Sequence, residues 1–99
     1  MKLHELAHGR TGDKGDISNI SVIAYRPEDW ELIEREVTAA RVAAHFGYLD
    51  AGSVTRYSLP QLHALNFVIR GALAGGVTRS LALDAHGKCL ASVLLAMEV

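Results

Sequence analysis

The sequence predicts an α+β fold in which two helices cover one face of a single β-sheet, giving a two-layer sandwich. Short segments with alternating apolar and polar residues predict strands, whereas apolar residues spaced three and four apart predict helices. The chain has 99 residues, which suits one hydrophobic core of ordinary domain size. We therefore expect a single domain over residues 1–99 with the element order ββαβαββ.

The first two predicted strands flank a polar loop. Residues 2–7 are expected to form a strand, and residues 9–16 combine three glycines with four charged residues, a composition typical of a loop. Residues 17–25 alternate in polarity and are rich in β-branched side chains, so we expect a second strand there. One face of that strand would carry the small polar residues Asn19 and Ser21.

A bent helix is predicted over residues 27–46. Pro27 suits a first helical turn, and Glu28 and Asp29 complement the positive end of the helix dipole. Thr38 is a candidate cap for a second helical segment after a bend, and Gly47 is suited to a left-handed terminator. The buried stripe of this helix would consist of Trp30, Ile33, Val37, Ala40 and Ala44.

The second half of the chain is predicted to supply a strand, a helix and a closing hairpin. Residues 54–59 read as a strand, and an apolar stripe predicts a helix over residues 62–73, although residues 66–69 would also suit a strand. Residues 77–83 and 88–97 would pair through a turn at 84–87. With both helices on one face of the sheet, this order is close to the ferredoxin-like pattern.

That arrangement leaves the other face of the sheet uncovered. Alternation places Ile23, and either Leu94 or Leu95, on the uncovered face. Exposed apolar patches of this kind usually mark association. We therefore expect a homo-oligomer or a complex with another protein.

Composition excludes several functional classes. With 49% hydrophobic and 21% charged residues, the chain can offset the entropy of ordering. A net charge of −1 gives no single-sign field to attract nucleic acid or an anionic membrane. The lone Cys89 fits a reducing compartment, and no apolar run is long enough for a membrane helix. A cytoplasmic protein is expected, without nucleic-acid or membrane partners.

The segment from Arg10 to Asp16 is the densest polar cluster and the first candidate site. Its glycines would let backbone N–H groups form an anion-binding nest beside Arg10 and Lys14. Asp13 and Asp16 would oppose an anion, however, and a purely structural hairpin loop is the competing interpretation. Two carboxylates are also too few for a calcium loop, so we expect neither a metal nor a cofactor.

Two further features lie near this cluster. His8 could pair with Asp13 or Asp16 as a general base, but no nucleophile or metal set accompanies it, so the catalytic residues are unknown. Arg79 follows a glycine-rich segment and would add a cation if that segment meets the first loop at one end of the sheet. The candidate ligand-binding residues are Arg10, Asp13, Lys14, Asp16 and Arg79.

Several segments resemble the C-terminal domain of the acyclic terpene utilisation (AtuA) protein family. The resemblance covers nearly the whole chain and rests on residues 6–16 (LAHGRTGDKGD), 65–67 (LNF), 71–81 (GALAGGVTRSL), 83–84 (LD) and 87–88 (GK). It implies a ferredoxin-like fold and a link to bacterial catabolism of branched or terpenoid acids and acyl-CoA compounds. It supplies no catalytic residues, and the large N-terminal domain of that family is not found in this chain.

Two functions are therefore expected. The first is a small non-catalytic or co-catalytic subunit that docks onto a separately encoded large AtuA-like protein. The alternative is a stand-alone homo-oligomer that binds a small acidic or CoA-type metabolite through the Arg10 to Asp16 segment and Arg79. A small hydrolase or lyase based on His8 has the least support.

Overall fold

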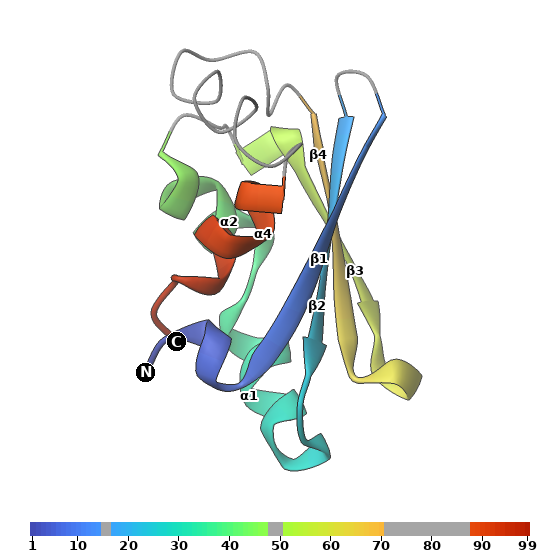
Figure 1. Cartoon of the computed structure of the whole chain (residues 1–99), viewed down its shortest axis with the longest axis vertical. Coiled ribbons are helices and arrows are strands. Elements are labelled where there is room, and N and C mark those ends of the chain that lie inside the picture. Colours follow the sequence, from blue (N-terminus) through green and yellow to red (C-terminus); the bar gives the residue numbers. More distant parts are fainter. Residues whose placement is uncertain (15–16, 48–50, 71–87) are drawn as a thin grey trace.

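The computed structural model describes residues 1–14, 17–47, 51–70 and 88–99. In these described ranges, four antiparallel strands form one sheet, and three α-helices and several short 3-10 turns accompany it (Figure 1). The elements are η1 (Leu3–Glu5), β1 (Ala7–Lys14), β2 (Ile17–Ala24), η2 (Pro27–Asp29), α1 (Trp30–Glu36), α2 (Ala39–Phe46), η3 (Ala51–Ser53), β3 (Val54–Leu59), η4 (Pro60–Leu62), β4 (Ala64–Arg70) and α4 (Lys88–Leu95).

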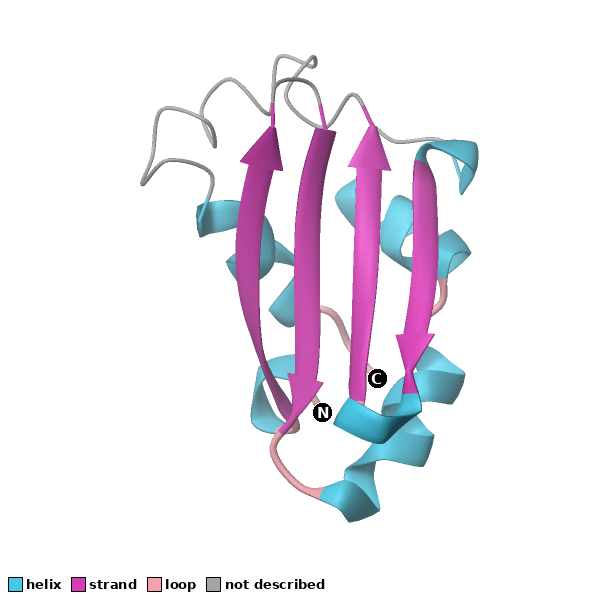
Figure 2. Cartoon of the chain, turned by 90° about the vertical axis from the view of Figure 1, so that its right-hand side faces the viewer, coloured by secondary structure: helices cyan, strands magenta, loops and turns pink. Residues whose placement is uncertain are grey.

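The strands lie in the order β1-β2-β4-β3, and each neighbouring pair is antiparallel. The three α-helices lie on one side of this sheet, and the opposite side is open among the described residues (Figures 1 and 2). The two-layer α+β class predicted from the sequence is therefore confirmed. The predicted order of strands and helices is not, because several segments adopt a different structure.

Local signals predict the boundaries of the bent helix well, but its buried stripe only in part. Trp30, Ile33 and Val37 are buried as predicted, whereas Ala40 and Ala44 are exposed because α2 buries Val42 and Ala43 after the bend. Pro27 opens the η2 turn that leads into α1, Thr38 Oγ1 accepts a hydrogen bond from the Arg41 amide at the start of α2, and Gly47 ends α2 with a φ of 84°. A side chain of the sheet stabilises the bend: Arg56 of β3 donates hydrogen bonds to the carbonyls of Glu34 and Val37 at 2.6 and 3.2 Å. The predicted strands at 17–25 and 54–59 are also present as β2 and β3.

Two predictions near the N-terminus are wrong. Residues 2–7 contain the η1 turn instead of a strand, and the expected loop at 9–16 is strand β1 as far as Lys14. Glycine near the start of β1 is explained by a close backbone approach: a Cβ on Gly9 would lie only 2.9 Å from the backbone oxygen of Ser21 on β2, whereas the α4 atoms Leu95 Cδ1 and Ala91 Cβ would be at contact distances of 3.5 and 3.7 Å. Glycine in a strand often marks such an approach.

The second half of the chain also departs from the predicted order. Residues 64–70 form β4 instead of a helix, because burial of Leu65, Phe67 and Ile69 follows the period of a strand. Residues 88–95 form helix α4 instead of a strand, so Leu94 and Leu95 pack toward the core and not on the open face. The strand and turn predicted at 77–83 and 84–87 lie outside the described residues.

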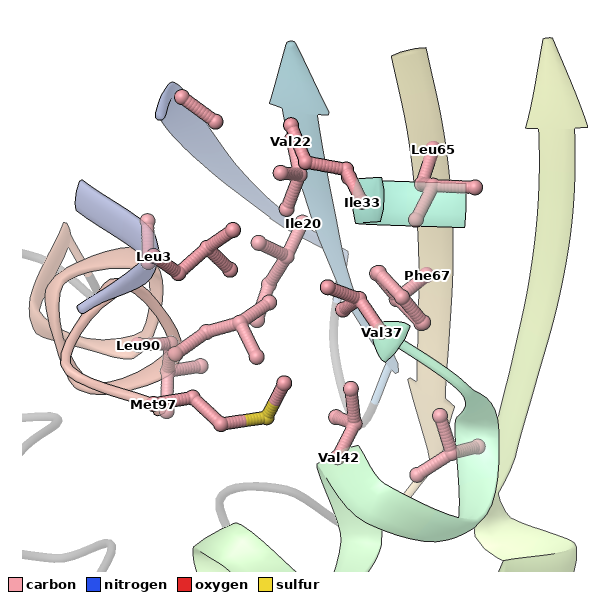
Figure 3. Packing of buried hydrophobic residues seen from close by; sticks show 14 of the residues in the cluster. Leu3, Ile20, Val22, Ile33, Val37, Val42, Leu65, Phe67, Leu90 and Met97 are labelled. Carbon is pink, nitrogen blue, oxygen red and sulfur yellow. The ribbon is translucent and has the colours of Figure 1, made fainter. Parts of the chain in front are cut away.

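The hydrophobic core lies between the sheet and the helices (Figure 3). Strands β2 and β4 contribute Ile20, Val22, Leu65 and Phe67, all fully buried. The helices and the chain ends cover them with a second set of apolar side chains: Leu3, Ile33, Val37, Val42, Leu90, Leu94 and Met97. Within the described ranges, no helix is long and apolar enough to span a membrane.

Candidate ligand-binding face of the sheet

The open face of the sheet carries an ordered set of side chains, because strand registry aligns residues of four strands in rows. Arg10 pairs with Ser21, Ser21 pairs with Asn66, and Asn66 pairs with Tyr57. Adjacent strands are about 5 Å apart, so side chains in such a row are direct neighbours. The Ser21 hydroxyl lies 3.5 Å from Asn66 Oδ1, which confirms that both side chains project on the same face. We call Arg10, Ser21, Asn66 and Tyr57 the polar row.

Two cavities on this face meet at the polar row. The first, about 650 Å³, is lined by Arg10, Asn19 and Ser21 together with neighbouring strand residues. The second, about 510 Å³, is lined by Asn19, Ser21 and Asn66 and otherwise by apolar side chains. Since Asn19 and Ser21 line both, the cavities are two parts of one continuous surface.

The apolar end of the face lies next to the polar row. Registry aligns His8, Ile23, Ala64 and Leu59 across the sheet, two residues along each strand from the polar row, which corresponds to about 7 Å. The His8 ring packs against Tyr25, with ring centroids 5.2 Å apart. We define the apolar end as Ile23, Leu59, Leu62 and Ala64, which all line the second cavity.

Charge is distributed unequally between the two layers. The open face bears the guanidinium groups of Arg10 and Arg70, both on exposed residues, and within the described ranges neither forms an ion pair. The described carboxylates outside β1 belong to the helices, the short turns and the C-terminal segment: Glu5, Glu28, Asp29, Glu31, Glu34, Glu36 and Glu98. The open face is therefore the side of the described structure that offers unpaired positive charge.

A comparison with protein families agrees with this architecture. The family model described as the AtuA ferredoxin-like domain matches residues 1–99, the whole chain. The chain belongs to this family. No curated protein and no solved structure gives a significant match.

The structure of this AtuA ferredoxin-like domain places only part of the candidate site suggested by the sequence. Arg10 lines the first cavity. Asp13 and Lys14 lie at the end of β1, where their backbones pair with Ser18 and Ile17, and Asp16 and Arg79 lie outside the described residues. The proposed meeting of Arg79 with the first loop is thus untested.

Two chemical interpretations of this segment need correction. From Arg10 to Lys14 the backbone is an extended strand paired with β2, so this part forms no loop whose amides turn inward around an anion. His8 and Asp13 are five residues apart on that strand, about 17 Å, so Asp13 is not the carboxylate partner of His8, and the alternative partner Asp16 lies outside the described residues. Among the described residues, no group of three His, Cys, Asp or Glu side chains is placed to hold a metal ion.

Sequence reasoning did not include in the candidate site the side chains that give the open face its polar centre. Asn19, Ser21 and Asn66 line the cavities. The alternation of β2 did predict a face with small polar residues. The signal for Asn66 was the same alternation in residues 64–70, which becomes visible once that segment is taken as a strand.

Proposed function

We propose that this AtuA ferredoxin-like domain is a non-catalytic binding module that holds a small acidic metabolite on its open sheet face. The observation that carries the proposal is the polar row, in which Arg10, Ser21 and Asn66 are direct neighbours beside two connected cavities. A guanidinium group binds a carboxylate through charge-assisted hydrogen bonds, and hydroxyl and amide groups add neutral donors.

The chemistry of the polar row favours binding over catalysis. Ser21 has the Asn66 carboxamide as its side-chain neighbour. An amide does not accept a proton from a hydroxyl at neutral pH, so Ser21 lacks the adjacent base that an activated nucleophile needs. The lone Cys89 of the chain is in keeping with a reducing compartment such as the cytoplasm.

The proposal is tested by titrating the chain with butyrate and with acetyl-coenzyme A, followed by NMR of the backbone amides. Arg10→Gln removes the charge of the anchoring side chain and should weaken binding tenfold or more, as expected for loss of a charge-assisted hydrogen bond. The matched control is Arg35→Gln, since Arg35 lies on α1 in the helix layer. Absence of binding, or equal weakening by both variants, would overturn the proposal.

A second candidate function is favoured by the exposure of Tyr57, Leu59 and Leu62 at one side of the open face. In this role the domain docks, as a non-catalytic or co-catalytic subunit, onto a large AtuA-like protein that takes part in bacterial catabolism of branched or terpenoid acids or acyl-CoA compounds. Self-association would use the same side chains. Sedimentation velocity of the chain, alone and with a large AtuA-like protein, measures both kinds of association. Leu62→Asp should abolish whichever complex forms, and a monomer under both conditions would exclude this role.

A further inference from the structure

The second cavity indicates that the proposed ligand has a hydrocarbon part in addition to its acidic group. It continues from the polar row onto the apolar end, where Ile23, Leu59 and Leu62 line it. Leu59 and Leu62 are 41% and 66% exposed. A small acid bound at Arg10 alone would leave these side chains in water, whereas a ligand with a hydrocarbon chain would cover them.

We propose that the ligand is an amphipathic free carboxylic acid, with its carboxylate beside Arg10 and its hydrocarbon chain lying across Ser21 toward Ile23, Leu59 and Leu62. This inference rests on the proposed function. It names the class of ligand that the shared lining of the two cavities accommodates.

Registry sets the length of the chain that this path accepts. Ile23 lies one strand across from Arg10 and two residues along, which corresponds to about 8 Å. Leu59 lies three strands across and two residues along, about 16 Å from Arg10. A short acid such as butyrate ends before Ile23, whereas a chain the length of decanoate extends well beyond it.

Charge favours this direction over the opposite end of the sheet. Toward the other end, Ile17 pairs with Arg70, so a hydrocarbon chain would lie beside a second guanidinium. Charge also favours a free acid over its coenzyme A thioester. A thioester has no carboxylate to offer Arg10.

The experiment measures dissociation constants for butyrate, hexanoate, octanoate and decanoate by NMR titration of the full chain, with decanol as the uncharged control. Each methylene group that becomes buried should tighten binding by up to about fourfold. Decanoate should therefore bind much more tightly than butyrate, and decanol should bind more weakly than decanoate.

Ile23→Thr and Ile17→Thr, on the same face of β2, provide a matched pair. Ile23→Thr should reduce the dependence of affinity on chain length while leaving butyrate binding unchanged. Leu62→Ser, in the η4 turn, should act in the same way as Ile23→Thr. Ile17→Thr makes the same chemical change at the other end of the strand, where Ile17 lines the first cavity but not the second, and should leave the dependence of affinity on chain length intact.

The outcomes separate the inference from the proposed function. Binding that depends on Arg10 but is equally strong for all four acids would overturn the inference and keep the proposed function. A length dependence that Ile17→Thr abolishes and Ile23→Thr does not, or tighter binding of decanoyl-coenzyme A than of decanoate, would also overturn the inference. No binding of any acid would overturn both.

Discussion

Gly9 lies where two strands of the sheet and helix α4 come together. A methyl group at this position would lie 2.9 Å from the backbone oxygen of Ser21 and 3.5 Å from Leu95 Cδ1 of α4. The carbonyl belongs to the paired strand and cannot rotate away. Gly9→Ala is therefore expected to lower the free energy of unfolding by about 1–3 kcal/mol, the usual cost of overpacking.

Gly12, on the same strand, is the matched control. A Cβ there would meet no atom within 4 Å among the described residues, so Gly12→Ala should change stability by less than about 0.5 kcal/mol. Urea denaturation of both variants measures the difference. Equal stability of the two would show that the Ser21 carbonyl leaves room for a methyl group at Gly9.

Ser18 is a buried polar residue that packing among the described residues does not satisfy. Its side chain is fully buried, and its hydroxyl has no hydrogen-bond partner in the part of the chain that the structure describes. An unpaired buried hydroxyl costs free energy, so Ser18→Ala should raise the free energy of unfolding by about 1 kcal/mol. Ser21→Ala on the open face should leave stability nearly unchanged, and a loss of stability in Ser18→Ala would show that the hydroxyl is hydrogen-bonded.

Local sequence signals, such as caps and terminators, predicted the helices and strands that local interactions determine. The cap at Thr38 and the terminator at Gly47 act within a few residues of the backbone they satisfy, and both are present as predicted. The helix expected over residues 62–73 fails because Leu65 and Ile69 fit a helical stripe and a strand equally well. The choice between helix and strand depends on Phe67, whose side chain is buried beneath the helix layer when the segment forms β4.

The same limit applies to β1 and α4, since each depends on the other. A glycine-rich, charged segment has weak strand propensity, and β1 forms where β2 pairs with it and α4 packs on it. The candidate site was predicted in part for this reason. Arg10 stands out by its charge. Alternation gives the faces of Asn19 and Asn66 within their own strands, but the contact between these faces follows from the pairing of β2 with β4, which no local pattern shows.

Helix α4 depends on β1 for a hydrogen bond at its N-terminal end. The first four amides of an α-helix lack partners within the helix, and the Ala91 amide, the fourth in α4, donates to Thr11 Oγ1 of β1 at 2.9 Å. Thr11→Val keeps the shape and removes the acceptor. We expect a loss of about 1 kcal/mol in the free energy of unfolding, together with faster hydrogen exchange in α4.

The control for this prediction is Thr11→Ser, which keeps the hydroxyl and should preserve slow exchange in α4. If Thr11→Val and Thr11→Ser exchange at the same rate, the hydrogen bond does not hold the start of the helix.

At the scale of the whole molecule, the two ends of the described chain meet at Glu98. Its carboxylate accepts a hydrogen bond from the Met1 ammonium group at 2.9 Å and lies 3.3 Å from Lys2 Nζ. The hydrogen bonds from these groups lower the pKa of Glu98 below its ordinary value of 4.5. A lowered folded-state pKa stabilises the fold above the unfolded-state value, and this contribution is lost as pH falls through the folded-state pKa.

The melting temperature of Glu98→Gln should therefore lie slightly below that of the unmodified chain at pH 6, and the gap should close as the pH falls below 4.5. Because the carboxylate is exposed, the gap will be small. Glu31→Gln, on α1, is the control. A gap of the same size at pH 3 and pH 6 would show that the carboxylate charge does not join the chain ends.

The separation of charge between the layers leads to a prediction about ionic strength. The open face carries Arg10 and Arg70 without described ion-pair partners, while glutamates occupy α1 on the other side of the sheet. An acid bound at Arg10 is attracted through solvent-exposed space, where dissolved salt screens the electrostatic interaction.

Raising the salt concentration from about 10 mM to about 1 M shortens the screening distance from roughly 30 Å to roughly 3 Å. The affinity for octanoate should therefore fall severalfold over this range, whereas the affinity for decanol should not fall. In Arg10→Gln the remaining affinity for octanoate should lose most of its salt dependence, while Arg35→Gln should keep it. Salt dependence that survives in Arg10→Gln would show that a different cation attracts the acid.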